Sequence, residues 1–557
     1  MRHYLTALRV TAITGLLIGA GVGLRDWSPA WPGLSLAVAS RPAAFGWLIG
    51  LCLSPLLGWA FSRRRVPEHR GAPRRWRRVL SIAISVVAVA PAALWIVVLI
   101  PIESLRPATA SSRAPEDTRP NLILITIDAL RADHLGIYGN DNGLTPNLDA
   151  FAAEATRYDS AYASSPWTLT SFASIFSSLP PSQCGLKVTT PRMHDWYLYS
   201  AKLPDSVELF HEQLHRDGYV TAAELTNCFL TRERGWGRGF DSFRNEDGPE
   251  LGAILTRADT ITENGLSWLR LNRHRPFFLW LHYLDPHVPY NSPDTPGEVR
   301  GKYPSDWLTR REYWYGKMAR RDEETKARYQ EFCREMYAEE VRFVDRWVGE
   351  LLSGIQRAGL WDSSLIVITS DHGEELFDHG GFEHGHTMHD ELLRVPLLVK
   401  WPGGIEADAR VSRTVGLSDL AATFLSVAGS EIPTTLQGDP LPRKYGPGGG
   451  EVYSEGILHG LEQVALTTDS RRVIWRPKAP PYREALRVYD READAGEQED
   501  LSDTDAADDV RERLKRRAEA ALQDCHEWKV SNEQEFRGID LSDATREKLR
   551  TLGYIGD

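Results

Sequence analysis

Two acidic residues of this chain stand where apolar, β-branched runs end. Asp128 follows the run 121–127, and Asp371, with His372 beside it, follows the run 365–369. Such runs are typical of buried parallel strands, and α/β proteins bind ligands in the crevices at the C-terminal ends of these strands. Carboxylates and imidazoles bind divalent cations, and two strand ends could supply three such ligands and leave one position open. An open position favours a catalytic metal over a structural one.

Histidines crowd the segment that follows the second acidic residue, at positions His372, His379, His384, His386 and His389. The simpler interpretation is a solvated polar loop. A strand end that carries an acid and an imidazole instead favours a site whose histidines bind metal or transfer protons. A further histidine, His287, follows the apolar run 277–283.

Thr168 opens a predicted helix that extends to residue 179. Leu169, Phe172, Ala173 and Phe176 recur there at the spacing of one helical face. The free N–H groups and the positive dipole end at a helix N-terminus favour an anion. Taken alone, a threonine at this place is a typical helix cap. Beside a metal, its hydroxyl could instead act as a nucleophile on the anionic group being transferred.

The elements that must position these residues alternate along the chain. Apolar periodicity predicts helices at 203–217, 254–271 and 323–358 and strands at 219–225 and 277–283, in addition to the two strands above. This alternation predicts an α/β fold with a large mixed, mostly parallel sheet flanked by helices. Residues 451–489 predict a smaller antiparallel sheet, and a charged helix follows at 510–522. The aromatic and basic segment 291–321 is either a lid over the site or a long surface insertion.

The first 101 residues differ in composition from the rest. Apolar stretches at 4–24, 43–61 and 79–101 predict three transmembrane helices. The loop 62–78 is rich in arginine, which places it in the cytoplasm and everything after residue 101 outside. A cleaved signal peptide is the alternative for the first stretch. The net charge is −11 although residues 1–78 are basic, so the outer part is strongly acidic, which argues against a nucleic-acid partner.

An ordered set of motifs carries a family resemblance from about residue 120 to the C-terminus. The motifs are Asn121–Asp128, Thr145–Asp149, Gly239–Asp241, Ser370–Glu374, Leu393–Leu397, Arg487–Asp490 and Leu549–Tyr554. Together they resemble the sulfatases of the alkaline phosphatase superfamily. The resemblance implies that fold, with a smaller C-terminal α+β subdomain. It divides the chain into a membrane anchor (1–101), a linker (102–119), a catalytic domain (120–430) and a C-terminal subdomain (431–557).

The resemblance also implies roles for individual residues. Asp128, Asp371 and His372 match metal ligands for a divalent metal (Ca, Zn or Mn). His287 and His386 match histidines that contact the substrate. Family members carry Cys or Ser in a Cys-x-Pro-x-Arg signature, and the cysteine is oxidised to formylglycine. Alignment of the following helix places Thr168 at that position.

The chain departs from the sulfatase pattern around the expected nucleophile. Ser164 begins a sequence that imitates the signature, but it lies one turn too early in this alignment and ranks second. The pocket lysines of the family are replaced near Thr226–Asn227 and at Gly385. The histidine at position 372, where sulfatases often carry Asn, resembles the pattern of the membrane phosphoethanolamine and phosphoglycerol transferases. Without formylglycine, an alcohol nucleophile would form a covalent ester intermediate.

These features predict a metal-dependent hydrolase of sulfate or phosphate esters that works outside the cytoplasmic membrane. The expected partner is a sulfated or phosphorylated ester, on a lipid or a glycan. Two alternatives remain open. One is transfer of a phospho group from a lipid to a glycan, and the other is a catalytically silent membrane protein that keeps the fold for binding.

Overall fold

The computed structural model describes residues 117–186, 201–245, 257–311, 313–443, 450–460, 462–477, 483–504 and 508–531. The predicted transmembrane helices, almost all of the linker and the motif 549–554 lie outside these residues. Among the helices within them, none combines the length and the apolar character that crossing a bilayer requires.

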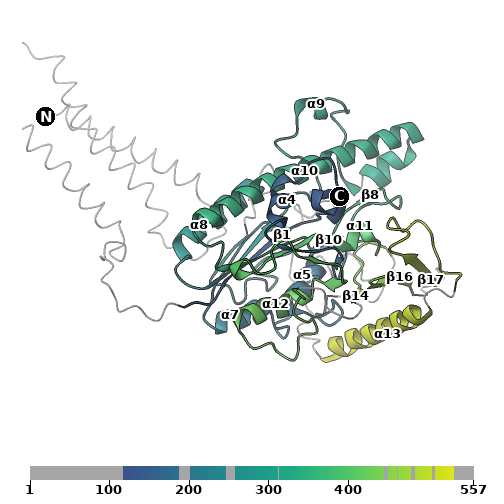
Figure 1. Cartoon of the computed structure of the whole chain (residues 1–557). Helices are drawn as coiled ribbons and strands as arrows, with labels where there is room; N and C mark the ends of the chain where they lie inside the picture. Colours follow the sequence, from purple (N-terminus) through teal and green to yellow (C-terminus); the bar gives the residue numbers. More distant parts are fainter. Residues whose placement is uncertain are drawn as a thin grey trace, which may run out of the picture. The chain divides into compact units, whose positions relative to one another are not determined.

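An eight-stranded mixed sheet forms the centre of the described chain, as predicted (Figure 1). The strands lie in the order β12-β2-β11-β7-β1-β6-β4-β5. Their bounds are β1 Asn121–Ile127, β2 Thr156–Tyr158, β4 Val220–Leu225, β5 Ser242–Asn245, β6 Phe277–Tyr283, β7 Ser364–Thr369, β11 Leu397–Lys400 and β12 Arg410–Val411. The strands from β7 to β5 are parallel, and β11 is antiparallel to both of its neighbours.

Helices cover both faces of this sheet (Figure 1). On one face α4 (Pro146–Ala152), α8 (Ala258–Asn272) and α10 (Glu323–Arg357) pack together, and on the other α5 (Thr168–Ser177), α7 (Phe210–Arg216) and α12 (Asp419–Ala428) do so. Successive strand residues point to opposite faces. Leu122 and Leu124 of β1 therefore join the cluster with α5, α7 and α12, while Ile123 and Ile125 join the other.

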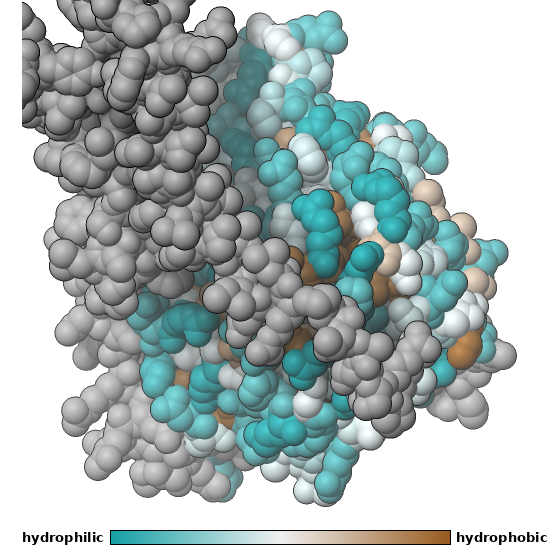
Figure 2. Space-filling view, turned by 90° about the vertical axis from the view of Figure 1, so that its left-hand side faces the viewer, coloured by the Kyte–Doolittle hydropathy of each residue, from teal (hydrophilic) through white to brown (hydrophobic). Residues whose placement is uncertain are grey.

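The apolar side chains of these elements are mostly enclosed. In the face of the molecule drawn in Figure 2, hydrophilic residues dominate the described surface, and apolar residues show only in small, separate areas. The central strands are buried over their full lengths. A continuous apolar run is therefore the correct signature of a strand here, because both faces of the sheet are covered.

The helix predicted at 203–217 is wrong in its first half, because α7 begins only at Phe210. Pro204 starts a turn in which the Val207 N–H donates to the Pro204 carbonyl. The backbone N–H of Leu209 then donates to the Glu212 carboxylate at 3.0 Å. This carboxylate bond satisfies a donor at the helix start and sets where α7 begins.

A second, antiparallel sheet lies in the C-terminal region, where the sequence predicted one. It consists of β14 (Glu451–Ser454), β15 (Val464–Thr468), β16 (Arg471–Arg476) and β17 (Ala485–Asp490), in this order. The helix α13 (Asp508–Ser531) packs against it through Val510, Leu514 and Ala518. These elements lie in the part of the chain that the resemblance assigned to the C-terminal subdomain (431–557).

Short elements complete the described chain. The segment 291–321 contains α9 (Gly297–Arg300), a π turn (Tyr313–Lys317) and a 3-10 turn (Met318–Arg320), and it packs on α10 through Trp314 and Met318. The remaining short strands and helices are β3 (Ala161–Tyr162), β8 (Glu375–Leu376), β9 (Phe382–Glu383), β10 (Arg394–Val395), β13 (Val415–Gly416), η2 (Ala132–His134), η3 (Gly136–Tyr138), α11 (Asp390–Leu393) and η6 (Pro402–Gly404).

Candidate active site

The register of β1 and β7 brings the two acidic strand ends together. Thr126 lies opposite Thr369 in this parallel pair, so Asp128 and Asp371 leave the sheet at the same edge. Ser370 joins the two ends, because its Oγ accepts the N–H of Leu130 at 2.9 Å and lies 2.6 Å from the Ile127 carbonyl oxygen. The backbone thus holds both carboxylates at one point.

Asp128, Asp371 and His372 form a compact, fully buried group. One ligand atom from each lies within 4.8 Å of the others. Nε2 of His372 lies 3.4 Å from Asp128 Oδ1 and 3.5 Å from Asp371 Oδ2. The other ring nitrogen, Nδ1, donates to the Gly373 carbonyl 2.8 Å away, and burial lowers the pKa of His372, which favours a neutral ring with its lone pair on Nε2. The lone pair therefore faces the two carboxylates.

This group fits a divalent cation. Oδ1 of Asp128 and both carboxylate oxygens of Asp371 are buried and accept no hydrogen bond from the described residues. Buried carboxylate oxygens without donors are costly unless a charge compensates them. The two carboxylates suit Zn, Mn or Ca, the imidazole favours Zn among these, and three protein ligands leave room for substrate.

The electrostatics of the two carboxylates also favour a bound cation. Burial, and then the negative charge of Asp128, raise the pKa of Asp371 well above its usual range. Burial also acts to raise the pKa of Asp128, but His287, His282 and His372 outweigh it and hold that pKa below its usual value. A bound cation would relieve this crowding of negative charge.

Thr168 lies beside the three ligands. It is the first residue of α5, and its Oγ1 lies 3.3 Å from Nε2 of His372. The residue in the cap position is Trp167, and no side chain caps the helix, so the interpretation of Thr168 as a cap is wrong. One turn further, Ser171 donates from Oγ to the Asp371 carbonyl at 2.6 Å. This bond fixes the start of α5 against the end of β7.

His287 lies in the same buried region. Its Nδ1 lies 2.6 Å from the Val288 carbonyl, to which it donates, and its ring centroid is 4.8 Å from that of His384. Burial lowers the pKa of His287, although the charge of Asp128 acts to raise it. The ring of His384 also lies 4.4 Å from that of His372, and its Nδ1 lies 2.8 Å from Glu374 Oε1. His384 thus connects the two histidines.

His386 and Ser164 have other neighbours. Nε2 of His386 lies 2.6 Å from Glu375 Oε2, and the His386 carbonyl accepts from Gln463. The Ser164 carbonyl accepts the N–H of Glu455. Among the described residues, no hydrogen bond or ion pair joins His386 or Ser164 to the three ligands. Their predicted roles stay predictions.

Three residues that contact the site were given no individual role in it from the sequence. Nε2 of His282 lies 3.3 Å from Asp128 Oδ2, and Asn227 donates from Nδ2 to the same oxygen at 3.1 Å. Both belong to strands near β1: His282 lies in β6, opposite Thr126, and Asn227 lies just after β4. The strand-end rule that found Asp128 would have found Asn227 as well. His384, the third, was only one of the five histidines noted in its segment, and the role of a substrate contact was given to His386.

Comparisons with known proteins agree with this architecture. A family model described as Sulfatase matches residues 120–430. An N-acetylglucosamine-6-O-sulfatase from Bacteroides thetaiotaomicron is 26% identical over 455 residues, which cover 67% of this chain and 78% of that protein.

Two solved structures share the fold. One, a complex with D-glucosamine-2-N,6-O-disulfate, has a TM-score of 0.58 and 19% identity and covers 73% of this chain and 98% of its own. The other, a phosphonate monoester hydrolase of Agrobacterium radiobacter, has a TM-score of 0.53 and 16% identity and covers 74% and 96%.

Proposed function

Because the chain belongs to the sulfatase family, we propose that it is a metal-dependent hydrolase of sulfate or phosphate esters with Thr168 as its nucleophile. One observation carries the proposal. The Thr168 hydroxyl lies 3.3 Å from His372 Nε2, in a group in which Asp128 Oδ1 and both oxygens of Asp371 are buried and accept no hydrogen bond from the described residues. An alcohol at a helix N-terminus and three metal-binding groups therefore share one small, fully buried volume.

Each residue of the site has its own role in the proposed reaction. Asp128, Asp371 and His372 would hold a divalent cation (Ca, Zn or Mn), which lowers the pKa of a neighbouring hydroxyl and neutralises charge on the ester. The first N–H groups of α5 face the anionic oxygens of the group being transferred. Ser171 keeps these donors in place, because it bonds the helix to the backbone of Asp371.

The proposed reaction has two steps. In the first, Thr168 Oγ1 forms a bond to the sulfur or phosphorus, and the bond to the alcohol oxygen of the substrate breaks. The leaving oxygen takes up the proton that Thr168 loses. In the second, water attacks the same central atom, which releases sulfate or phosphate and restores the Thr168 hydroxyl. No formylglycine is required.

We assign the proton transfer to His287 and a substrate contact to His386. Nδ1 of His287 is held by the Val288 carbonyl, so the proton would be exchanged at Nε2. The lowered pKa of His287, which burial causes, favours a neutral ring that can accept a proton before it donates one.

Phospho-group transfer is the second candidate. At one of the replaced lysine positions, Asn227 donates to Asp128. Among the described residues, the main groups that lower the pKa of Asp128 are histidines and not lysine or arginine. A site with fewer fixed cations binds a compact dianion less strongly, which favours a diester-like group. An acceptor alcohol would then replace water in the second step.

The proposed substrate is a sulfated or phosphorylated lipid or glycan outside the cytoplasmic membrane. The arginine-rich loop 62–78 between two apolar stretches supports this location, with the chain crossing the membrane several times. Protease added to intact cells should cleave the domain after residue 117. Protection of that domain until the cells are lysed would contradict the location.

The test of the activity uses purified full-length protein. Metal analysis is combined with turnover of an aryl sulfate, an aryl phosphate and an aryl phosphodiester, for the wild type, Thr168→Ala and Ser164→Ala. We expect bound divalent metal, turnover by the wild type and by Ser164→Ala, and none by Thr168→Ala. Absence of metal, or full activity of Thr168→Ala, would overturn the proposal. Bound metal without any turnover would support the silent alternative.

A further inference from the structure

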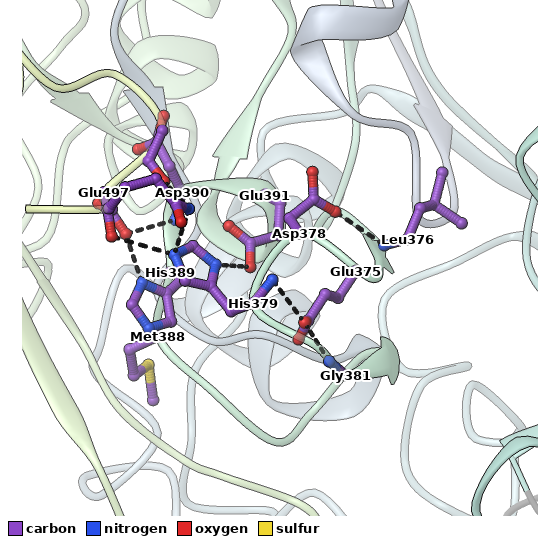
Figure 3. A network of polar contacts seen from close by, with 12 residues as sticks. Glu375, Leu376, Asp378, His379, Gly381, Met388, His389, Asp390, Glu391 and Glu497 are labelled. Atoms are coloured by element: carbon purple, nitrogen blue, oxygen red, sulfur yellow. Dashed lines mark hydrogen bonds and ion pairs between the residues drawn. The ribbon is translucent and has the colours of Figure 1, made fainter. Parts of the chain in front are cut away.

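His379 and His389 connect the segment after the metal ligands to the C-terminal subdomain. His379 and His389 stack face to face, with ring centroids 3.7 Å apart and an angle of 12° between the planes. Figure 3 shows the pair between Glu391, on the same segment, and Glu497, which follows β17. Nδ1 of His389 lies 2.6 Å from Glu497 Oε2.

The hydrogen bonds define the protonation of His379. Its Nδ1 lies 2.8 Å from Glu391 Oε1, and its Nε2 lies 3.1 Å from the backbone carbonyl oxygen of Glu497. Both of these partners can only accept, so both ring nitrogens can donate and the contacts favour the charged ring. The ring of His389, in contrast, donates to Glu497 and can accept at Nε2 from Arg487, 3.4 Å away.

The same atoms could be taken for a metal site, because ligand atoms of His379, His389 and Glu497 lie within 4.8 Å of one another. Two contacts argue against it. His379 has no lone pair to offer when both nitrogens donate. The remaining carboxylate oxygen of Glu497 forms an ion pair with Nε of the buried Arg472 at 2.9 Å. A metal would have to displace both cations.

The charges around His379 therefore form a closed network. Negative groups are Glu391, Glu497 and Asp390, and positive groups are His379, Arg472 and Arg487. Arg472 also binds Asp390 at 2.7 Å and the Met388 carbonyl at 2.9 Å. The backbone N–H of His379 donates to Glu375 at 3.0 Å, and the side chain of Gln498 lies 3.4 Å from Nε2.

From Glu391 the network continues to the metal ligands through the backbone. The Glu391 carbonyl accepts the N–H of Glu374 at 3.0 Å, and the Leu392 carbonyl accepts the N–H of Gly373 at 2.8 Å. These two residues follow His372 directly. A Cβ at Gly373 would lie 2.0 Å from the Glu391 carbonyl oxygen, so the backbone segments that contain Gly373 and Glu391 are in close contact. Moving Glu391 must therefore move the residues next to His372.

We propose that His379 is a positioning residue, a cation through which the C-terminal subdomain holds Glu391, and with it the backbone beside His372, in place. This inference rests on the proposed function, because it concerns the geometry of the same site. Outer-shell partners of metal ligands are known to affect metal affinity and activity by about 10- to 100-fold.

The arrangement makes the site sensitive to alkaline pH. Burial acts to lower the pKa of His379, but the Glu391 carboxylate outweighs it, and the pKa is raised to about 9. The ring thus stays charged through the neutral range. Above about pH 9 it loses one of its two donors and must give up one of its two contacts.

The test compares wild type, His379→Gln and Glu391→Gln in full-length protein, with His215→Gln as the matched control. His215 also faces a carboxylate, Asp241, at 3.5 Å, but it is half exposed and lies on α7. Two quantities are measured: the pH profile of kcat/KM, and hydrogen–deuterium exchange of peptides covering 371–392 at one fixed pH. Thermal unfolding identifies any variant that fails to fold.

We expect Glu391→Gln to shift the alkaline limb of the pH profile to lower pH by at least about one unit, because the substitution removes the charge that stabilises the imidazolium of His379. We expect His379→Gln to lower kcat/KM by about 10-fold or more at neutral pH and to speed exchange in 371–392. The His215→Gln control should match the wild type in both measurements.

Three results would overturn the inference. One is an unchanged alkaline limb in Glu391→Gln, which would indicate a merely structural role. Another is exchange in 371–392 that is identical in folded His379→Gln and wild type. The third is a second equivalent of bound metal in the wild type that His379→Gln lacks, which would identify a metal site at His379. A wild type without turnover would instead contradict the proposed function, and the exchange comparison would still test the positioning role.

Discussion

The Thr168 hydroxyl and the Nε2 lone pair of His372 face each other across 3.3 Å. The two residues come from different elements, the first turn of α5 and the segment after β7. Ser171 ties these elements together by its bond to the Asp371 carbonyl. The distance is therefore a property of the scaffold, and the chemistry assigned to Thr168 depends on it.

Thr168→Val should abolish turnover, whereas Thr168→Ser should retain it. Valine has the shape of threonine without the hydroxyl, so it removes the attacking atom and keeps the packing. We expect kcat/KM to fall by about 10³-fold or more in Thr168→Val. Mass spectrometry of acid-quenched wild type should find a sulfo or phospho group on the peptide that contains Thr168. Turnover of Thr168→Val at the wild-type rate would contradict the assignment.

Asp371→Asn should stabilise the metal-free protein and prevent metal binding. The buried Asp371 carboxylate accepts no hydrogen bond from the described residues and lies beside buried Asp128, so it destabilises the fold until a cation neutralises it. With chelator present, we expect the free energy of unfolding of the variant to exceed that of the wild type by about 0.5–2 kcal/mol. Added divalent metal should then raise the Tm of the wild type alone. A variant that is less stable than the wild type in chelator would show that the carboxylates do not repel each other.

The large features of this site could be predicted from the sequence, because strand ends are visible in it. Asp128 and Asp371 each end an apolar run, and the parallel sheet brings such ends to one edge. The order of strands is not visible in the same way. His282 faces Asp128 only because β6 lies beside β1, a neighbour relationship that the strand pattern does not reveal.

Loop geometry limited the prediction further. His384 and His386 are two positions apart on an irregular segment, where no periodicity indicates which side chain points inward. The structure turns His384 toward His372 and His386 toward Glu375. The network of His379 with Glu497 spans more than a hundred residues, so no local pattern could indicate it.

Gly373→Ala should disturb the metal ligands without touching them. The added Cβ would lie 2.0 Å from the Glu391 carbonyl oxygen, so one of the two backbone segments must shift. We expect a loss of about 1–3 kcal/mol in the free energy of unfolding, with weaker metal binding in a titration. Gly297→Ala is the control, since its Cβ would meet nothing within 4 Å. Metal affinity equal to that of the wild type would show that the backbone beside His372 can move freely.

Arg472→Met should loosen the C-terminal subdomain. The guanidinium is fully buried and forms ion pairs with Glu497 and Asp390, so its loss leaves the buried Glu497 carboxylate without this cation. Breaking such a pair costs about 3–5 kcal/mol, as measured by denaturant unfolding. Adding Glu497→Gln to Arg472→Met should recover part of this loss, because it removes one uncompensated charge. A double variant that shows the sum of the two single effects would mean that the pair is not coupled.

The stability of the wild type should fall as the pH rises from about 6.5 to about 9. The folded protein raises the pKa of His379 from 6.5 to about 9, although burial opposes this, because Glu391 stabilises the charged ring. A raised pKa means that the folded state binds the proton more tightly than the unfolded state. The stabilisation is therefore complete below about pH 6.5 and is lost as the pH passes through about 9.

The size of this effect follows from the same shift. The full displacement would correspond to about 3 kcal/mol, which solvent screening of the partly exposed ring reduces to about 1–2 kcal/mol. Urea unfolding of wild type and His379→Gln between pH 6.5 and pH 9.5 measures it. The two curves of free energy against pH should converge toward the alkaline end, because glutamine does not titrate. Parallel curves would show that His379 carries no proton-linked stability.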